Sequence, residues 1–381
     1  VAPSRGLGDV YKRQAYMEDL VLGGSDSYTT GIRQDTYYSG PSWNRYFNPD
    51  LTWEVGEKIN LGLDLQLFND FNLTFDIFRE KRRDIFMTRE NSIPEIVGTG
   101  ETKITSNNGE MENKGLDLAI DYNKQITKDF FLSFKSTLTF ARNKVLKMDE
   151  PPYFEYPGLS DVGHPLGTYW GYVADGLFPD QETIDNSPRQ DLGYTPQPGD
   201  IKYVNQPNAK GEYDNVINSN DRVAIGHPYD PELVYGFGPS MKWKNWDFSF
   251  FFQGVARTSF MMYGMHPFGT TSIKNMLQFV ADDHWSVDNP NPNAAYPRLT
   301  KDSNGNNDQY STYWLRNAAF LKLKNAEIGY TYKGMRFYLS GVNLLTFSPF
   351  KHWDPEMGGG NGLYYPTQRA VSYTHLRAHE T

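Results

Sequence analysis

The feature that most constrains the fold is a pair of long alternating segments joined by a very short turn. Residues 319–332 and 336–347 are predicted strands, and Lys333, Gly334 and Met335 form the predicted turn. Each arm exceeds ten residues, about the length that a tilted strand needs to cross a bilayer. Aromatic residues gather at the turn end, as expected where strands pass through lipid headgroups. The hairpin is therefore interpreted as membrane-spanning. These aromatic residues are Tyr330, Tyr332, Phe337 and Tyr338.

The same alternation recurs along the chain, so that one face of each predicted strand is apolar and the other is polar. Leucine occupies every second position from Leu61 to Leu67, between Asn60, Gly62, Asp64 and Gln66. Further predicted strands follow this rule. Their apolar positions are Leu73, Phe75 and Ile77; Leu116, Leu118, Ile120 and Tyr122; Leu132, Phe134, Leu138 and Phe140; and Phe248, Phe250 and Phe252, with another strand over residues 233–243.

The connections between these strands alternate in length. Short turns at 69–70, 127–129, 244–245 and 333–335 are separated by long polar segments at 84–113, 146–232 and 254–318, and residues 15–50 are expected to be a loop with one strand. Outer-membrane barrels have short periplasmic turns and long extracellular loops, whereas a sandwich or propeller has no reason for this asymmetry. We therefore predict an all-β fold, an antiparallel transmembrane β-barrel portion of about nine strands that forms an open curled sheet with long extracellular loops. About nine strands cannot close a transporter barrel of roughly 22, so two sheet edges should be unpaired.

The two faces of this sheet should meet different surroundings. One set of apolar side chains should lie on the convex face and stay largely exposed, namely Leu61, Leu63, Leu65, Phe248, Phe250 and Phe252. An ionised carboxylate is costly in lipid and inexpensive in a hydrated lumen. The aspartates of the polar faces should therefore line the interior; they are Asp64, Asp76, Asp117 and Asp121.

Composition narrows the class of protein further. The chain has no cysteine, which excludes disulfides, thiolate metal sites and a cysteine nucleophile. A net charge of -9 and the absence of a basic run argue against a nucleic-acid partner. Aromatic residues make up 15% of a chain whose mean hydropathy is -0.63, a combination that suits a transmembrane barrel. It also suits the alternative, a soluble or surface-attached all-β glycan-binding protein or glycosidase.

Catalytic and metal-binding patterns are missing from the sequence. It contains no Ser/His/Asp arrangement, phosphate-binding glycine loop or HExxH motif, and its seven histidines lack ligand spacing. Asp282 and Asp283 could in principle serve glycoside hydrolysis, but neighbours in a helical stretch point apart, so a solvated helix surface is favoured. We predict no enzyme activity, no catalytic residues, no metal site and no cofactor.

The best candidates for substrate binding are aromatic residues in the long central loop. Tyr169, Trp170 and Tyr172 lie in the run Gly167 to Tyr172. Exposed Tyr and Trp rings suit stacking on sugar rings because they present rigid apolar faces at low entropic cost. The alternative is that these rings pack the loop against itself.

Several sequence blocks, in one order along most of the chain, resemble the C-terminal barrel of SusC/RagA-type TonB-dependent outer-membrane transporters. The blocks are residues 167–172, 198–203, 284–290, 296–299, 313–325, 340–345, 354–356 and 365–369. The resemblance implies location in the outer membrane and import of a large nutrient, above all an oligosaccharide, although RagA-like relatives take peptides. It also implies a SusD-like surface lipoprotein over the loops and a TonB complex that acts through a preceding plug and TonB-contacting segment.

The family often carries an acidic, calcium-binding loop after the block at 198–203. Here the corresponding stretch runs from Asn205 to Asp221, and Lys210 and Pro207 interrupt the required alternation of oxygen ligands. The sequence favours an ordinary polar turn.

Both ends of the chain resemble translated sequencing-library adapter. We therefore expect residues 1–14 and 370–381 to be adapter-like and residues 15–369 to be a C-terminal segment of the transporter barrel. Val371, Tyr373 and Thr374 nevertheless favour extended structure.

Overall fold

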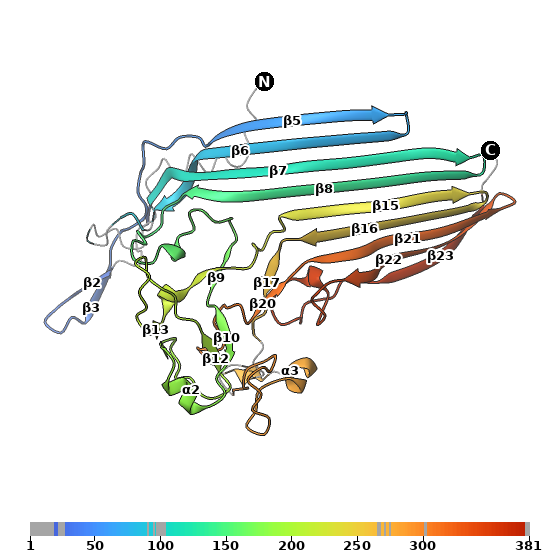
Figure 1. Cartoon of the computed structure of the whole chain (residues 1–381). Coiled ribbons are helices and arrows are strands. Elements are labelled where there is room, and N and C mark those ends of the chain that lie inside the picture. The colour runs from blue at the N-terminus through green and yellow to red at the C-terminus, as the bar shows by residue number, and fades with distance from the viewer. Residues whose placement is uncertain are drawn as a thin grey trace.

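The computed structural model describes residues 19–21, 27–89, 91–93, 96, 104–264, 268–269, 272–273, 276–300 and 303–377. Its central feature is one antiparallel sheet with the strand order β23-β22-β21-β16-β15-β8-β7-β6-β5 (Figure 1). The strands are β5 (Val55–Leu67), β6 (Phe71–Arg89), β7 (Ile104–Thr127), β8 (Phe130–Lys147), β15 (Leu233–Trp243), β16 (Trp246–Ala256), β21 (Phe320–Tyr332), β22 (Met335–Phe347) and β23 (Ala370–Arg377).

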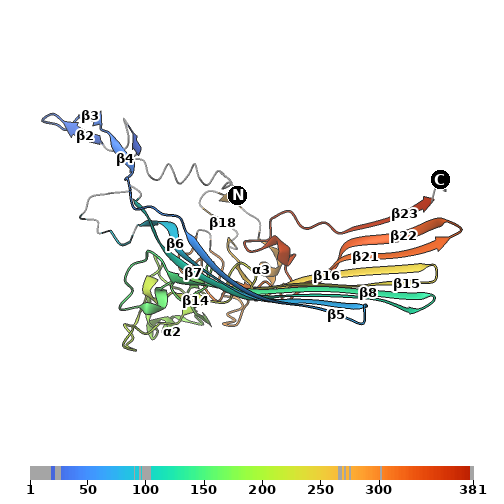
Figure 2. The same ribbon diagram turned by 90° about the horizontal axis from the view of Figure 1, so that it is seen from above.

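All four predicted short turns join neighbouring strands at one end of this sheet, and the long connections gather at the other end. Lys333 and Gly334 both have positive φ, which suits the tight turn between β21 and β22. Seen from above, the sheet is curled and, among the described residues, it ends at β5 and β23 without closing (Figure 2). The predicted fold class is confirmed. The ninth strand, β23, lies in the segment that the sequence marks as adapter-like.

The register between strands separates apolar from polar side chains. One row of cross-strand partners consists of Leu63, Phe75, Leu118, Leu138 and Tyr235, from five successive strands. The adjacent row, on the opposite face, consists of Asp64, Thr74, Ala119, Thr137 and Gly236. Because side chains alternate between faces with a period of two, the whole sheet has one apolar and one polar face.

Exposure on the apolar face is uneven. Leu61, Leu63 and Leu65 are 73%, 49% and 37% exposed, as predicted. The prediction of large exposure was wrong for Phe248, Phe250 and Phe252, which are half-buried. Their strand, β16, is paired on both sides, with β15 and β21, and two of the three rings stack on neighbouring rings. Phe252 stacks on Phe237 with ring centroids 5.1 Å apart, and Phe248 stacks on Trp246 at 6.1 Å.

The polar face carries the four aspartates that the sequence assigned to the interior. Each one has a polar partner on the same or the next strand. Thr74 donates to Asp64, Asn60 to Asp76 and Thr139 to Asp117, and Lys135 pairs with Asp121. The four aspartates lie on one face of the sheet, as expected for side chains that line a hydrated interior.

The loop predicted over residues 84–113 was wrong, because most of it belongs to β6 and β7. This part of the two strands lies beyond the stretch that alternates apolar and polar residues, here called the apolar belt. It therefore lacks the pattern that marks a membrane strand. Ion pairs across the strands take its place, with Arg79 contacting Glu112 at 2.6 Å and Lys81 contacting Glu110 at 3.1 Å.

The first part of the chain holds two small two-stranded sheets instead of a loop with one strand. β1 (Asp19–Val21) pairs with β4 (Ser42–Arg45), and β2 (Ser27–Thr30) pairs with β3 (Thr36–Ser39). Tyr28 and Tyr38 stack across the second pair at 5.4 Å.

The long connections fold into a compact layer at the loop end of the sheet, here called the loop layer (residues 148–232, 257–319 and 348–369). Among its described residues it is built from short elements. They are η2 (Pro157–Leu159), β9 (Tyr169–Gly171), β10 (Ala174–Leu177), α2 (Gln181–Asp185), β11 (Arg189–Gln190), β12 (Ile201–Tyr203), β13 (Val216–Ile217), η3 (Ser219–Asp221), β14 (Val223–Ile225), β17 (Ser259–Met261), β18 (Phe268–Gly269), β19 (Ser272–Ile273), α3 (Gln278–Asp282), β20 (Leu315–Asn317) and η4 (Pro355–Met357).

The main hydrophobic core lies in this loop layer and not in the sheet. Ile201, Tyr203, Phe260, Met262 and Val280 are each at most 2% exposed and belong to one cluster. Helices contribute little, and none within the described part of the chain is long and apolar enough to cross a membrane. The loop layer therefore has its own folded interior.

A glycine in the middle of the sheet provides a test of this packing. A Cβ on Gly115 would lie 2.4 Å from the ring of Phe78 and 2.3 Å from the backbone oxygen of Phe140. We expect Gly115→Ala to destabilise the sheet by about 1–3 kcal/mol through overpacking. Urea titration of the lipid-reconstituted protein measures this loss. Gly56→Ala in β5 is the matched control, because its Cβ would meet only a Glu80 oxygen at 3.6 Å. Equal effects of the two substitutions would contradict the packing.

Candidate functional site

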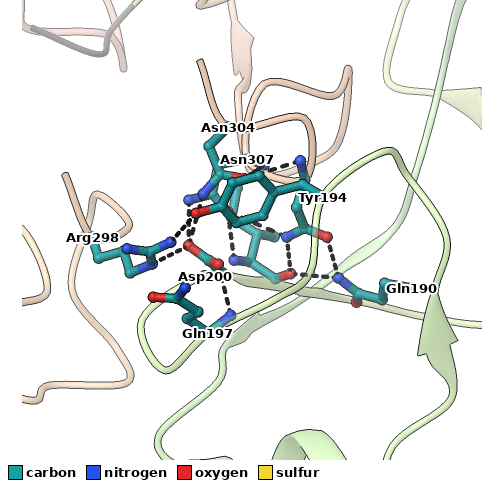
Figure 3. Close-up of polar contacts among 9 residues, drawn as sticks. Gln190, Tyr194, Gln197, Asp200, Arg298, Asn304 and Asn307 are labelled. Atoms are coloured by element: carbon teal, nitrogen blue, oxygen red, sulfur yellow. Dashed lines mark hydrogen bonds and ion pairs between the residues drawn. The ribbon is translucent and has the colours of Figure 1, made fainter. Parts of the chain in front are cut away.

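The loop layer contains a buried carboxylate that ties three of its segments together (Figure 3). Asp200 is fully buried, and its Oδ1 accepts hydrogen bonds from Arg298 Nε at 2.7 Å, Asn307 Nδ2 at 2.9 Å and Asn304 Nδ2 at 3.0 Å. Its Oδ2 accepts from the backbone N–H of Gln197 at 2.8 Å. The ion pair with a guanidinium and the hydrogen bonds from several donors offset the free energy that a carboxylate loses when burial removes its water.

The amides of the same network hold the backbone of β12. Asn307 Oδ1 accepts from Ile201 N at 2.9 Å, Asn306 Nδ2 donates to Ile201 O at 2.9 Å, and Gln190 Oε1 accepts from Tyr203 N at 2.7 Å. Residues 304–307 are thus fixed against residues 190–203, more than a hundred positions earlier in the chain.

One glycine makes this arrangement possible. Gly199 has φ +88°, and a Cβ there would lie 2.3 Å from the ring of Trp285. The residue just before Asp200 therefore needs both positive φ and no side chain.

Backbone hydrogen bonds between loops bring five tyrosines to one place, here called the tyrosine patch (Tyr169, Tyr229, Tyr263, Tyr310 and Tyr364). Tyr229 N donates to Gly167 O at 3.1 Å, Tyr172 N donates to Tyr310 O at 2.9 Å, and Tyr263 N donates to Gly360 O at 3.1 Å. These bonds join residues 167–172 to Tyr229 and Tyr310, and they join Tyr263 to the segment that carries Tyr364; the phenol groups of Tyr169 and Tyr263 lie close enough to interact.

The patch is exposed and its phenol groups interact. Tyr229, Tyr263, Tyr310 and Tyr364 are 59%, 50%, 48% and 55% exposed. The hydroxyls of Tyr263 and Tyr364 are 3.4 Å apart. Burial, with smaller contributions from Tyr229 and Tyr310, raises the pKa of Tyr169 to about 12. The patch thus presents hydroxyl-bearing rings to solvent.

The segment that carries Tyr364 is anchored to the sheet by a buried lysine. Lys322 of β21 is fully buried and contacts Asp354 at 2.6 Å and Glu356 at 2.5 Å. Lys324 contacts the other oxygen of Glu356 at 2.6 Å. These ion pairs join the loop layer to the wall of the sheet.

The three predicted substrate-binding residues have different surroundings. Tyr169 is half-buried and belongs to the tyrosine patch. Trp170 is half-buried, donates from Nε1 to Asp161 at 2.6 Å and meets the His164 ring edge-on. Tyr172 is only 3% exposed and packs against Tyr203 at 5.2 Å, so the packing alternative describes this ring.

Sequence reasoning missed the other four tyrosines of the patch. They come from separate loops, and no local pattern marks them among 26 tyrosines. The one available signal was that Tyr310 and Tyr364 lie close in sequence to two of the blocks that carry the family resemblance, those at 313–325 and 365–369.

The acidic residues considered in the sequence serve local structure. Asp221 is 2% exposed and accepts backbone N–H bonds from Gln206 at 2.7 Å and Asn218 at 2.8 Å, as part of a capping box. Asp282 ends α3 and accepts from Gln278 at 2.6 Å on an exposed surface. In the described part of the chain, no three His, Asp or Glu side chains are grouped as metal ligands.

Comparison with known proteins places this architecture in a family. The family model described as TonB dependent receptor-like, beta-barrel matches residues 16–344. The chain is 28% identical to TonB-dependent receptor SusC of Bacteroides thetaiotaomicron, over 98% of this chain and 36% of that protein. It is 26% identical to TonB-dependent receptor P3 of Formosa agariphila, over 84% of this chain and 32% of that protein.

Among solved structures, the RagAB peptide transporter has the same fold. The TM-score is 0.68 at 20% identity, over 95% of this chain and 38% of that chain. The chain thus spans about a third of the length of the relatives it matches.

The chain therefore belongs to the family of TonB-dependent outer-membrane transporters, as part of the β-barrel. The predicted resemblance to SusC/RagA-type members is confirmed, and so is the location in the outer membrane.

The Asp200 network yields a prediction about the loop layer. Asp200→Ala removes the carboxylate that pairs with the largely buried guanidinium of Arg298, and breaking such a pair costs about 3–5 kcal/mol. We expect faster hydrogen exchange in peptides that cover residues 189–204. Asp191→Ala is the matched control, because Asp191 pairs with Arg189 on the exposed surface. Unchanged protection in Asp200→Ala would show that the network does not hold the layer.

Proposed function

We propose that the protein imports a large nutrient, an oligosaccharide, across the outer membrane with energy from a TonB complex. The observation that carries this proposal is the family match over residues 16–344, together with a sheet whose two faces suit lipid and a hydrated interior. By the same resemblance, TonB acts through a plug and a TonB-contacting segment.

The tyrosine patch supports an oligosaccharide as the ligand. The phenol groups of five tyrosines lie near one another on the loop layer, and such residues combine apolar stacking with hydrogen bonding at low entropic cost. Tyr169 contacts the ligand as part of the patch, Trp170 lies next to it, and Tyr172 supports the backbone beneath Tyr310. An oligosaccharide crosses several rings at once, so each ring adds a small share of the affinity.

We further propose that a SusD-like surface lipoprotein covers the loop layer. The layer lies at the loop end of the sheet, where the long connections gather (Figure 1). The relatives that match are named as receptors and transporters, and the proposal includes no enzyme activity for this chain.

The soluble glycan-binding protein or glycosidase that composition left open is not supported. A soluble all-β protein has to bury the apolar face of its sheet against another layer of the fold. The structure instead has one large sheet whose apolar face remains uncovered at Leu61 and Leu63.

Binding to a panel of oligosaccharides and peptides tests the ligand class. We expect the detergent-solubilised protein to retain oligosaccharides, and the double substitution Tyr229→Ala with Tyr310→Ala to weaken retention by about fivefold or more. Tyr213→Ala is the matched control, since Tyr213 is 60% exposed in the same layer but lies outside the patch. Retention of peptides alone would reject the oligosaccharide, and equal losses in the control would reject the patch.

Uptake by intact cells tests the energy source. Accumulation of a labelled oligosaccharide that the protein binds should stop when the TonB gene is deleted, while surface binding should persist. Continued uptake without TonB would contradict active import.

A further inference from the structure

A small cavity opens beside the tyrosine patch. Its volume is about 160 Å³, and Tyr263 and Tyr310 belong both to its wall and to the patch. Behind them the wall is formed by Met262, Val280, Tyr296 and Trp314, which belong to the buried core of the loop layer. The cavity is therefore a recess at the edge of the proposed ligand path.

Most polar side chains of the wall are engaged in bonds with the protein, and Asp308 Oδ2 accepts from Asn304 N at 3.1 Å. Asn304 and Asn307 donate to Asp200, and Arg298 donates to Asp200 and to the hydroxyl of Tyr194. The Nε2 of Gln309 donates to Gly305 O at 2.8 Å. These groups belong to the network of Figure 3 or to its immediate surroundings.

Two aromatic residues of the wall also bond their polar atoms to the protein. Trp314 Nε1 donates to Asn307 O at 2.6 Å, and the hydroxyl of Tyr296 lies 3.3 Å from His352 Nε2. What these residues present to the cavity is their ring surface. A hydroxyl-rich sugar ring placed here would leave several of its hydroxyls unpaired, and each buried unpaired hydroxyl costs about 1–3 kcal/mol.

The volume limits what can enter. A dry cavity of about 150 Å³ lined by apolar side chains holds one benzene molecule. The recess therefore has room for one six-membered ring and not for two.

We infer that this recess binds a single apolar ring carried by the ligand, while the rest of the ligand lies on the tyrosine patch. An aryl substituent on an oligosaccharide supplies such a ring, and that source follows from the proposed function. The inference that the recess binds a ring is drawn from the residues of its wall alone, so it can be tested separately from the import proposal.

Saturation-transfer NMR with three small probes tests the inference on the detergent-solubilised protein. Phenyl β-glucoside should bind at least about tenfold more tightly than methyl β-glucoside, with saturation stronger on its phenyl protons than on its sugar protons. N-acetylphenylalaninamide distinguishes the source of the ring. If it binds and phenyl β-glucoside does not, the recess is supported and the oligosaccharide proposal is rejected. Equal binding of the two glucosides, or no binding of any probe, would overturn the inference.

Two substitutions locate the bound ring. Val280→Phe should fill the recess and abolish binding of phenyl β-glucoside. The matched control is Val287→Phe, because Val287 is 85% exposed and lies outside the wall. Leu299→Ala enlarges the recess without filling it, so it should retain phenyl β-glucoside and additionally admit 2-naphthyl β-glucoside. Unchanged phenyl binding in Val280→Phe, or no gain of the naphthyl probe in Leu299→Ala, would place the ring elsewhere and refute the assignment.

Discussion

The constraint on which the structure depends is that one sheet must meet hydrocarbon on one face and a hydrated interior on the other. In lipid every backbone N–H and C=O must be paired within the protein, so the segments that cross are long antiparallel strands. The period of two then fixes every side chain. A shift of one residue between β6 and β7 would move Asp117 and Asp121 into lipid. The register that pairs Asp76 with Asp117 and Phe75 with Leu118 is therefore strongly specified.

A second constraint operates at the loop end, where the chain is no longer in lipid and needs an interior of its own. The blocks that carry the family resemblance meet there in pairs. Asp200 from the block at 198–203 contacts Arg298 from the block at 296–299, and Lys322 from the block at 313–325 contacts Asp354 and Glu356. The first pair holds the loop layer together, and the second attaches that layer to the wall. The tyrosine patch and the apolar recess lie on the frame that these contacts create.

Local rules were sufficient for the sheet. The alternation from Leu61 to Leu67 and the turn at Lys333 and Gly334 depend only on near neighbours, and the strands and hairpins follow from them. Beyond the apolar belt that rule no longer applies. Glu110 and Glu112 gave the appearance of a loop, although they pair across β6 and β7 with Lys81 and Arg79.

The functional surface depends on contacts between distant segments, which no local pattern encodes. Tyr172 is buried because Tyr203 and the backbone of Tyr310 cover it, whereas Tyr229 and Tyr263 are exposed in an equally aromatic setting. Asp200 and Arg298 were visible as members of sequence blocks, but their pairing across 98 positions was not.

The most direct test of the two-faced sheet is spin-label accessibility along β7 of the lipid-reconstituted protein. Because the chain has no cysteine, labels can be placed one at a time at positions 116–122. The account predicts that collisions with oxygen are most frequent at Leu116, Leu118, Ile120 and Tyr122. Collisions with a water-soluble nickel complex should peak at the positions between them, where collisions with oxygen are least frequent. Profiles that rise and fall together, or that lack a period of two, would contradict the assignment of the two faces.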